Sequence, residues 1–202
     1  MPGLLYLAAG LRPTEGLLSW RLLSSISAYY YTGGVGVFIG VLFALSLFLF
    51  SYPGYKGYRA DRILGKIAGV AALGVALFPT AAPSGVSEPS WWSHATRVIH
   101  YASTIVLFGA FILFAVWLFR KSGVKDKRKR PPEKRRRDAA CLLCGIGMGL
   151  CVLWAGSSLI TNASIFWPEA IAIMAFAISW LVKGEAYQPV VNTVHRIRSW
   201  RR

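Results

Sequence analysis

Long apolar stretches, separated by short polar connections, constrain the fold of this chain more than any other feature. Hydrophobic residues make up 55% of its 202 positions, which is more apolar surface than one water-soluble core of this size can bury. A helix needs roughly 20 apolar residues to cross about 30 Å of hydrocarbon. Five stretches approach or reach that length: 33–50, 63–82, 98–119, 139–160 and 163–182. The sequence therefore predicts an all-α, polytopic transmembrane helix bundle with five membrane-spanning helices.

The N-terminal segment has a less regular pattern. Its apolar run GLLYLAAGL is short, and the following RPTEG brings two charges and a proline, which disfavour a spanning helix. It also lacks the basic start and the small-residue cleavage site of a signal peptide. We expect residues 1–32 to form an interfacial or partial helix, followed by the bundle at 33–182 and a basic tail at 183–202. These parts form a single integral membrane domain, 1–202.

The distribution of Lys and Arg predicts the orientation of the helices. Three basic residues lie in the connection 51–62, eleven in 120–137 and five in the tail after Val182. The connection 81–97 has only Arg97, and the connection between the last two stretches has none. Because cytoplasmic loops carry the excess of Lys and Arg, this alternation places the C-terminus in the cytoplasm and the motif SISAYYY outside.

The most basic connection, 120–137, invites a second interpretation. The net charge of +15 and the run KDKRKRPPEKRRR are features that nucleic-acid-binding proteins share. Here, however, the run is a short cytoplasmic loop between two apolar stretches. Basic residues in such a place interact with anionic lipid headgroups at about 1 kcal/mol each. We therefore expect membrane lipids as partners, with anionic headgroups at this loop, and no nucleic acid.

Polar residues gather at the predicted outer level of all five helices. Side-chain polarity within a membrane is costly and commonly marks a functional site. The motifs SSISAYYYTGG, ALFPT, VIHYAST, LITN and FWPEA all fall at this level. We expect them to line one pocket open to the outer leaflet. The candidate ligand-binding residues are Ser25, Ser27, Tyr30, Tyr31, Thr80, His100, Ser103, Asn162 and Glu169.

Each of these residues also has a plainer interpretation. His100 can make a structural hydrogen bond between helices, and Glu169 can be a carboxylate favoured by the dipole at a helix N-terminus. The tyrosines can form an aromatic belt at the membrane interface. The pocket hypothesis makes a sharper prediction, because an unpaired carboxylate at this depth is expensive. Glu169 should then lie within reach of His100 or of a tyrosine hydroxyl.

Two further patterns favour packing over chemistry. Cys141, Cys144 and Cys151 fall on one face of the fourth stretch, but no second CxxC or histidine pair accompanies them to complete a tetrahedral metal site. We expect no metal, no cofactor and no catalytic residue. Glycines four residues apart allow close approach of helix backbones, and three such pairs occur: Gly36 with Gly40, Gly65 with Gly69, and Gly145 with Gly149.

Several motifs resemble, in the same order, those of a family of uncharacterised multi-pass membrane proteins of bacteria that carry a domain of unknown function. They are SISAYYYT, VFIGVLFALSLFLFSYPGY, GVALFPT, VIHYA and FWPEAIAIMAFAISWLVKGE, and together they cover about residues 25–185. The resemblance implies the bacterial cytoplasmic (inner) membrane and a six-helix ancestor with both ends in the cytoplasm. Members begin with a further hydrophobic segment, so the first helix has degenerated here or the start lies further upstream. No activity follows from the resemblance.

Three functions are compatible with this sequence. Binding or transport of a small polar or amphiphilic ligand is favoured by the mixed aromatic and polar lining of the expected pocket. An intramembrane lipid hydrolase is the alternative enzyme, although His94, His100 and Glu169 are the only outer candidates for metal ligands. A non-catalytic subunit that docks a partner membrane protein, or a homo-oligomer, is the third. The sequence contains no nucleotide-binding loop, dinucleotide fingerprint, haem motif or nucleophile elbow.

Overall fold

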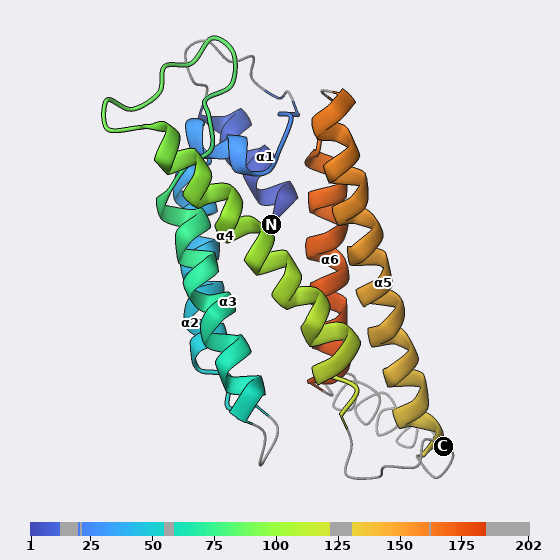
Figure 1. The fold of residues 1–202 in the computed structure, drawn as a ribbon. Helices are drawn as coiled ribbons and strands as arrows, with labels where there is room; N and C mark the ends of the chain where they lie inside the picture. The colour runs from blue at the N-terminus through green and yellow to red at the C-terminus, as the bar shows by residue number, and fades with distance from the viewer. Residues whose placement is uncertain (13–19, 21, 55–58, 122–130, 162, 185–202) are drawn as a thin grey trace, which may run out of the picture.

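A computed structural model describes the chain except for residues 13–19, 21, 55–58, 122–130, 162 and 185–202. Helices are the only regular secondary structure of the described part, which has six α-helices, a 3₁₀ helix, a π turn and no strand (Figure 1). The all-α prediction is therefore confirmed. The elements are α1 (Pro2–Leu11), η1 (Ser27–Tyr31), α2 (Val35–Phe50), α3 (Arg59–Leu77), α4 (His94–Leu113), η2 (Phe114–Leu118), α5 (Pro132–Thr161) and α6 (Phe166–Lys183).

Three stretches of helix in the described residues are long and apolar enough to cross a membrane, fewer than the five predicted. They are His94–Leu118, Pro132–Ser158 and Phe166–Lys183. Helix α2 is apolar but has only 16 residues. Helix α3 has 19 residues, but its first turns carry Arg59, Asp61, Arg62 and Lys66, and these charges lower its mean hydropathy.

The helices form two antiparallel pairs that α4 connects. Figure 1 shows α2 beside α3 on one side of the bundle and α5 beside α6 on the other, with α4 running obliquely between the pairs. Helix α4 packs mainly on α3, and its continuation η2 reaches α5. The two pairs are therefore joined by α4 and η2 toward one end of the bundle, while other elements lie between them at the opposite end.

An aromatic cluster holds the two pairs together at the end where η2 lies. The rings of Phe111 and Phe176 stack with their centroids 3.7 Å apart. The indole of Trp180 on α6 packs against four further rings, from Phe48, Tyr52, Phe114 and Phe119. Stacked and edge-to-face pairs of this kind each add roughly 0.5–1.5 kcal/mol beyond the burial of their area. This end of the bundle is therefore tightly packed.

The expected glycine contacts occur on two of the three helices. A Cβ added to Gly65 would lie 2.8 Å from the Leu49 carbonyl oxygen, and one added to Gly69 would lie 3.2 Å from the Ser46 carbonyl oxygen. A Cβ added to Gly145 would lie 2.4 Å from the Val116 side chain. The contacts of Gly65 and Gly145 are too close for any larger residue at those positions. In contrast, Gly36, Gly40 and Gly149 would meet no atom within 4 Å, so they take no part in packing within the described chain.

Helix α1 is short, as expected for a partial helix, and one part of it enters the bundle. Leu5 is fully buried in the core, and Met1 packs against the same cluster. The N-terminus lies at about mid-height of the bundle in Figure 1. The end of the helix lies close to the start of α2, because a Cβ on Gly33 would lie 2.5 Å from the Arg12 carbonyl oxygen.

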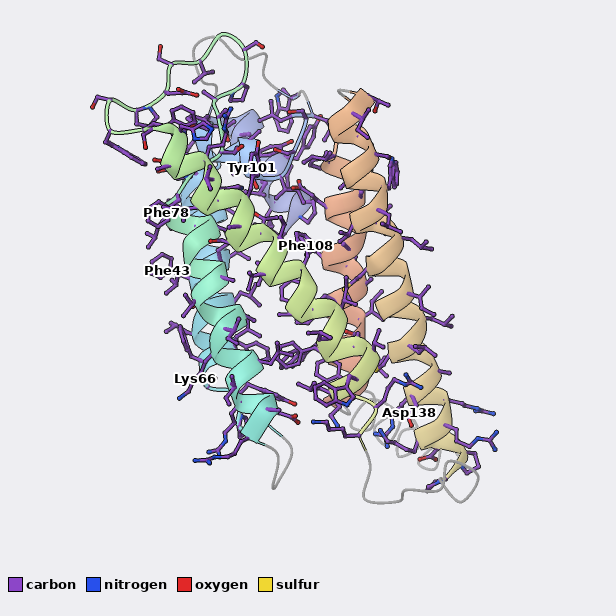
Figure 2. The ribbon with its side chains drawn as sticks, in the orientation of Figure 1. Phe43, Lys66, Phe78, Tyr101, Phe108 and Asp138 are labelled. Carbon is purple, nitrogen blue, oxygen red and sulfur yellow. The ribbon has the colours of Figure 1, made fainter. Side chains whose placement is uncertain are left out.

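The loop predicted at 120–137 is shorter in the structure, because α5 begins at Pro132. A proline fits the first turn of a helix, where its missing N–H costs no hydrogen bond. Arg135, Arg136 and Arg137 are therefore helical residues of α5. Nitrogen-bearing side chains gather at this end of the bundle, near the labelled Lys66 and Asp138 (Figure 2), which we call the basic end.

Candidate functional site

The end opposite the basic end contains a segment outside the α-helices, residues 24–32, which includes η1 and which we call the serine-tyrosine segment. Its own hydroxyl groups satisfy its backbone. The Ser25 hydroxyl accepts a hydrogen bond from the Ala28 N–H at 3.1 Å, and the Thr32 hydroxyl donates to the Tyr29 carbonyl at 2.8 Å. Backbone groups away from water must find such partners. The serine and threonine residues thus explain how an irregular segment can be buried here.

Helix α6 holds one side of this segment. The Ile26 N–H donates to Glu169 Oε2 at 2.7 Å. Slightly earlier in both segments, the Ser24 carbonyl accepts from the Ile165 N–H at 2.8 Å and from the Ser164 hydroxyl at 3.1 Å. Glu169 lies in the first turn of α6, where a carboxylate is also favoured by the helix dipole. Its second role is to bind the backbone of the segment.

Helices α3 and α4 hold the other side through His100. This imidazole is 2% exposed. Its Nδ1 lies 2.6 Å from the Phe78 carbonyl oxygen, and its Nε2 lies 3.1 Å from the Ser27 hydroxyl. Because a carbonyl can only accept, Nδ1 carries the proton, and a neutral Nε2 accepts from Ser27. The Phe78 carbonyl can serve as acceptor because α3 ends at Leu77 and proline follows.

The motif ALFPT supplies two further carbonyl acceptors. The Tyr31 hydroxyl donates to the Thr80 carbonyl at 2.6 Å, and the Trp92 indole N–H lies 3.3 Å from the Pro79 carbonyl and 3.2 Å from that of Thr80. The Thr80 hydroxyl lies 3.3 Å from that of Tyr101. Burial, with a smaller contribution from the charge of Glu88, raises the pKa of Tyr31 to about 12. Tyr31 is therefore neutral at physiological pH.

Six of the nine predicted site residues thus lie in or on one hydrogen-bonded network. These are Ser25, Ser27, Tyr31, Thr80, His100 and Glu169. The expected direct contact of Glu169 with His100 or with a tyrosine hydroxyl is not among the hydrogen bonds of the described residues. Instead, the two side chains bind successive residues of the same segment, Ile26 and Ser27.

The other three predicted residues have different surroundings. The Tyr30 ring packs edge-to-face on Tyr31 and on Phe38 of α2, with centroids 5.4 and 6.4 Å away. Ser103 lies where α4 crosses α3, because a Cβ on Gly74 would come within 2.1 Å of its hydroxyl. Asn162 lies outside the described residues.

Three aromatic residues of this end were not among the nine predicted site residues. Trp92 and Tyr101 reach the carbonyl and hydroxyl of Thr80. Tyr29 is fully buried, with its ring 6.2 Å from that of Phe166, and its hydroxyl makes no hydrogen bond within the described residues. The signal was available in principle, since aromatic residues with a polar tip favour sites with one apolar and one polar side.

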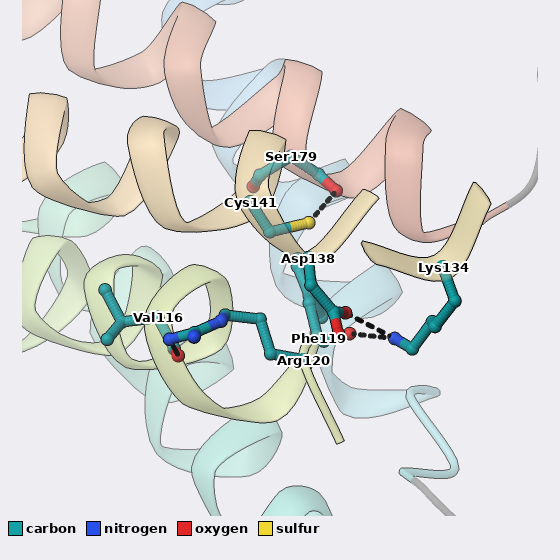
Figure 3. Close-up of polar contacts among 7 residues, drawn as sticks. All are labelled: Val116, Phe119, Arg120, Lys134, Asp138, Cys141 and Ser179. Carbon is teal, nitrogen blue, oxygen red and sulfur yellow. Dashed lines mark hydrogen bonds and ion pairs between the residues drawn. The ribbon is translucent and has the colours of Figure 1, made fainter. Parts of the chain in front are cut away.

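The basic end is built from ion pairs, which sequence reasoning also missed. Asp61, fully buried at the start of α3, pairs with Lys121, whose ammonium lies 4.3 Å from the centre of the Trp117 ring. On α5, Asp138 pairs with Lys134 at 2.6 Å (Figure 3). Both aspartates lie near many basic residues in the sequence, so the sequence could not predict which basic residue each of them pairs with.

The cysteines behave as packing residues in the structure. Cys141 and Cys151 are buried, and all three thiols are free. The Cys141 thiol donates weakly to the Ser179 carbonyl, with Sγ and O 3.7 Å apart (Figure 3). Among the described residues, no three His, Cys, Asp or Glu side chains are grouped so that they could hold a metal ion.

Comparison with protein-family models, curated proteins and solved structures gives no significant match.

Proposed function

We propose that this chain is an integral membrane protein that binds or transports a small polar or amphiphilic ligand at the end of the bundle formed by the serine-tyrosine segment. One observation carries the proposal: Glu169 on α6 and His100 on α4 bind successive residues of the serine-tyrosine segment. The segment therefore lies between the two helix pairs and is held from both sides. A ligand that replaces one of these bonds would loosen the junction between the pairs.

The chemistry of this end suits a ligand with one polar and one apolar part. Hydroxyl groups, an imidazole and a carboxylate are set among the rings of Tyr29, Tyr30 and Phe166. Ligand sites typically combine an apolar lining with a few well-placed polar groups. The buried Tyr29 hydroxyl, which makes no hydrogen bond within the described residues, would gain a partner from a polar group of the ligand.

The ligand would reach this end from outside a bacterial inner membrane. In this topology α2 to α6 all span the membrane, the basic end faces the cytoplasm, and the serine-tyrosine segment faces out. The clustering of Lys and Arg at one end supports this orientation. Helices α2 and α3 would cross as a pair, since α3 packs its glycines on α2, and Lys66 on α3 would extend to the headgroups.

Thiol labelling tests this orientation. Single cysteines are introduced at Ser87 and Glu133, both exposed, in a variant whose three native cysteines are replaced by alanine. An impermeant thiol reagent applied to intact cells should label Ser87→Cys and spare Glu133→Cys until the cells are lysed. Labelling of Glu133→Cys alone in intact cells would contradict the proposed orientation.

Photo-crosslinking tests the ligand site. Purified protein is irradiated with a lysophospholipid that carries a diazirine on its acyl chain. Crosslinks should fall within residues 24–32 and on the facing parts of α4 and α6, and unlabelled lysophospholipid should compete. Glu169→Ala should weaken these crosslinks and Ser103→Ala should preserve them. Crosslinks confined to exposed apolar residues on the outside of the bundle, such as Leu47 and Leu150, would contradict the proposal.

A further inference from the structure

We propose that Ser27 is a nucleophile activated by His100, and that it accepts the acyl group of an amphiphilic ester. The inference rests on the proposed ligand site and adds a reaction and a substrate class to it. It begins from a difference among the hydroxyl groups of the serine-tyrosine segment. Ser25 and Thr32 bind backbone groups of the segment itself, whereas Ser27 binds the side chain of a base from another helix.

The geometry around His100 has the three parts that an activated serine requires. The nucleophile Oγ lies 3.1 Å from Nε2, and the Phe78 carbonyl lies 2.6 Å from Nδ1. The carbonyl fixes the proton on Nδ1, so the lone pair of Nε2 faces the Ser27 hydroxyl. In the serine proteases a carboxylate occupies the position of this carbonyl. A neutral carbonyl orients the ring in the same way but stabilises the imidazolium less.

The surroundings hold Ser27 in place and exclude water. Ser27 and His100 are 8% and 2% exposed. Ser27 is the first residue of η1, and both of its neighbours are anchored, since the Ile26 N–H binds Glu169 and the Ala28 N–H binds Ser25. A nucleophile held this firmly beside its base needs little reorganisation to react. Movement of the segment would admit the ester.

The reaction balances without any metal or redox partner. Ser27 Oγ attacks the carbonyl carbon of the ester while its proton passes to His100 Nε2. The bond between that carbon and the alcohol oxygen then breaks, and His100 returns the proton to the departing alcohol. Water that enters when the segment moves then attacks the acyl carbon while its proton passes to the same nitrogen. The bond from that carbon to Ser27 Oγ breaks, His100 returns the proton to Oγ, and the acid is released. An acyl chain would lie along the apolar helices, which makes an ester of an amphiphile the expected substrate.

A fluorophosphonate probe tests the proposal directly, because it phosphonylates activated serines. The full-length protein in detergent is treated with an alkyl fluorophosphonate, and the modified residue is identified by mass spectrometry. We expect modification at Ser27, none in Ser27→Ala, and a rate about 100-fold lower in His100→Gln, the usual scale for loss of a general base. Ser87→Ala, in an exposed loop, and Ser103→Ala, where α4 crosses α3, are the controls and should be modified at the wild-type rate.

The outcomes separate this inference from the proposed function. If Ser27 stays unmodified in the wild-type protein while the lysophospholipid crosslinks persist, the proposal that Ser27 is a nucleophile is wrong. The proposed ligand site is then still supported. If both fail, both proposals fall. Modification of another serine, or an unchanged rate in a folded His100→Gln, would also overturn the inference. The mapping of the wild-type site remains decisive even if His100→Gln does not fold.

Discussion

At the two ends of the bundle, buried polar groups are paired by different kinds of interaction. At the basic end, charged side chains pair directly, as Asp61 does with Lys121 and Asp138 with Lys134. At the opposite end, the serine-tyrosine segment is held by an imidazole, a hydroxyl and a carboxylate that bind hydroxyl and backbone groups. Figure 2 shows how far apart these regions lie, with Asp138 near one end and Tyr101 near the other.

This difference has an energetic consequence. A buried ion pair is costly to break, because removing one partner leaves an uncompensated charge. A hydrogen bond to a backbone N–H or a hydroxyl has a net value of only about 0.5–1.5 kcal/mol, and a ligand can replace it. The aromatic cluster around Trp180 adds further packing at the basic end. The interactions at the basic end are therefore suited to hold the helices together. Those around the serine-tyrosine segment are suited to a change of partner when a ligand binds.

The largest effect is expected for Lys121→Met. Asp61 is fully buried, and the loss of the Lys121 ammonium beside it should reduce the free energy of unfolding by up to about 3–5 kcal/mol. Thermal unfolding in detergent, followed by circular dichroism, measures the change. Lys66→Met removes an exposed lysine of α3 and should change stability by less than about 0.5 kcal/mol. Equal losses in the two variants would contradict the contrast between the ends.

A smaller effect is expected at Glu169. Glu169→Ala leaves the Ile26 N–H without its acceptor, which should cost about 1–3 kcal/mol. Glu169→Gln keeps a side-chain carbonyl oxygen that can accept the same bond, so it should lose less than half as much. Denaturant unfolding of the two variants distinguishes these outcomes. If glutamine is as damaging as alanine, the charge itself, and not the hydrogen bond, holds the segment.

Tyr31→Phe should cost about 1 kcal/mol, because it removes one buried hydrogen bond to the Thr80 carbonyl. The wild-type protein should also show a pH dependence from this group. Its pKa is raised from about 10 to about 12 in the folded protein, so the folded state favours the neutral phenol. The resulting stability is fully present below pH 10 and is lost as the pH rises toward 12.

Unfolding measured at pH 9 and pH 11 tests this titration. The loss of stability between the two should be smaller in Tyr31→Phe than in the wild-type protein. Ser87→Ala, in an exposed loop, removes no titrating group and serves as the control, which should follow the wild-type pH dependence. A Tyr31→Phe variant that loses stability over this range as steeply as the wild type would contradict the assignment to Tyr31.

The smallest effect is expected for the paired change of Arg135 and Arg136 to glutamine. Both are exposed on the first turns of α5, and solvated charges there contribute less than about 0.5 kcal/mol. Arg137 is half-buried, so Arg137→Gln should cost more than the other two together. Comparison of melting temperatures measures both. A larger loss from the exposed pair would mean that the start of α5 depends on those charges.

The same contrast explains what the sequence could predict. Polar residues such as His100 and Glu169 stand out in an apolar background, so their shared level in the bundle was predictable from the helix order. Their actual partners were not, because Ile26 contributes its backbone N–H, and a backbone group leaves no mark in a sequence. The tight turn 24–32 with Ser25 as its internal acceptor depends on three-dimensional packing in the same way.

At the basic end, the large number of lysines and arginines made the ion pairs unpredictable. Asp61 and Asp138 lie among so many lysines and arginines that composition alone could not select Lys121 and Lys134 as partners. The start of α5 at Pro132 was missed because charged residues resemble a loop, although proline is favoured in the first turn of a helix. The predicted stretches included residues of turns, so α2 begins two residues later than 33–50 and α3 ends five residues earlier than 63–82.

The rate of thiol labelling at Ala28 tests most directly whether the serine-tyrosine segment is held inside the bundle by His100 and Glu169. Ala28 is 3% exposed, whereas Ser87 is exposed. In the variant without native cysteines, maleimide should label Ala28→Cys at least about tenfold more slowly than Ser87→Cys, which corresponds to about 1.4 kcal/mol for exposing the segment. Adding Glu169→Ala and His100→Ala should bring the rates together. Labelling of Ala28→Cys as fast as Ser87→Cys, with both helix residues intact, would contradict the account.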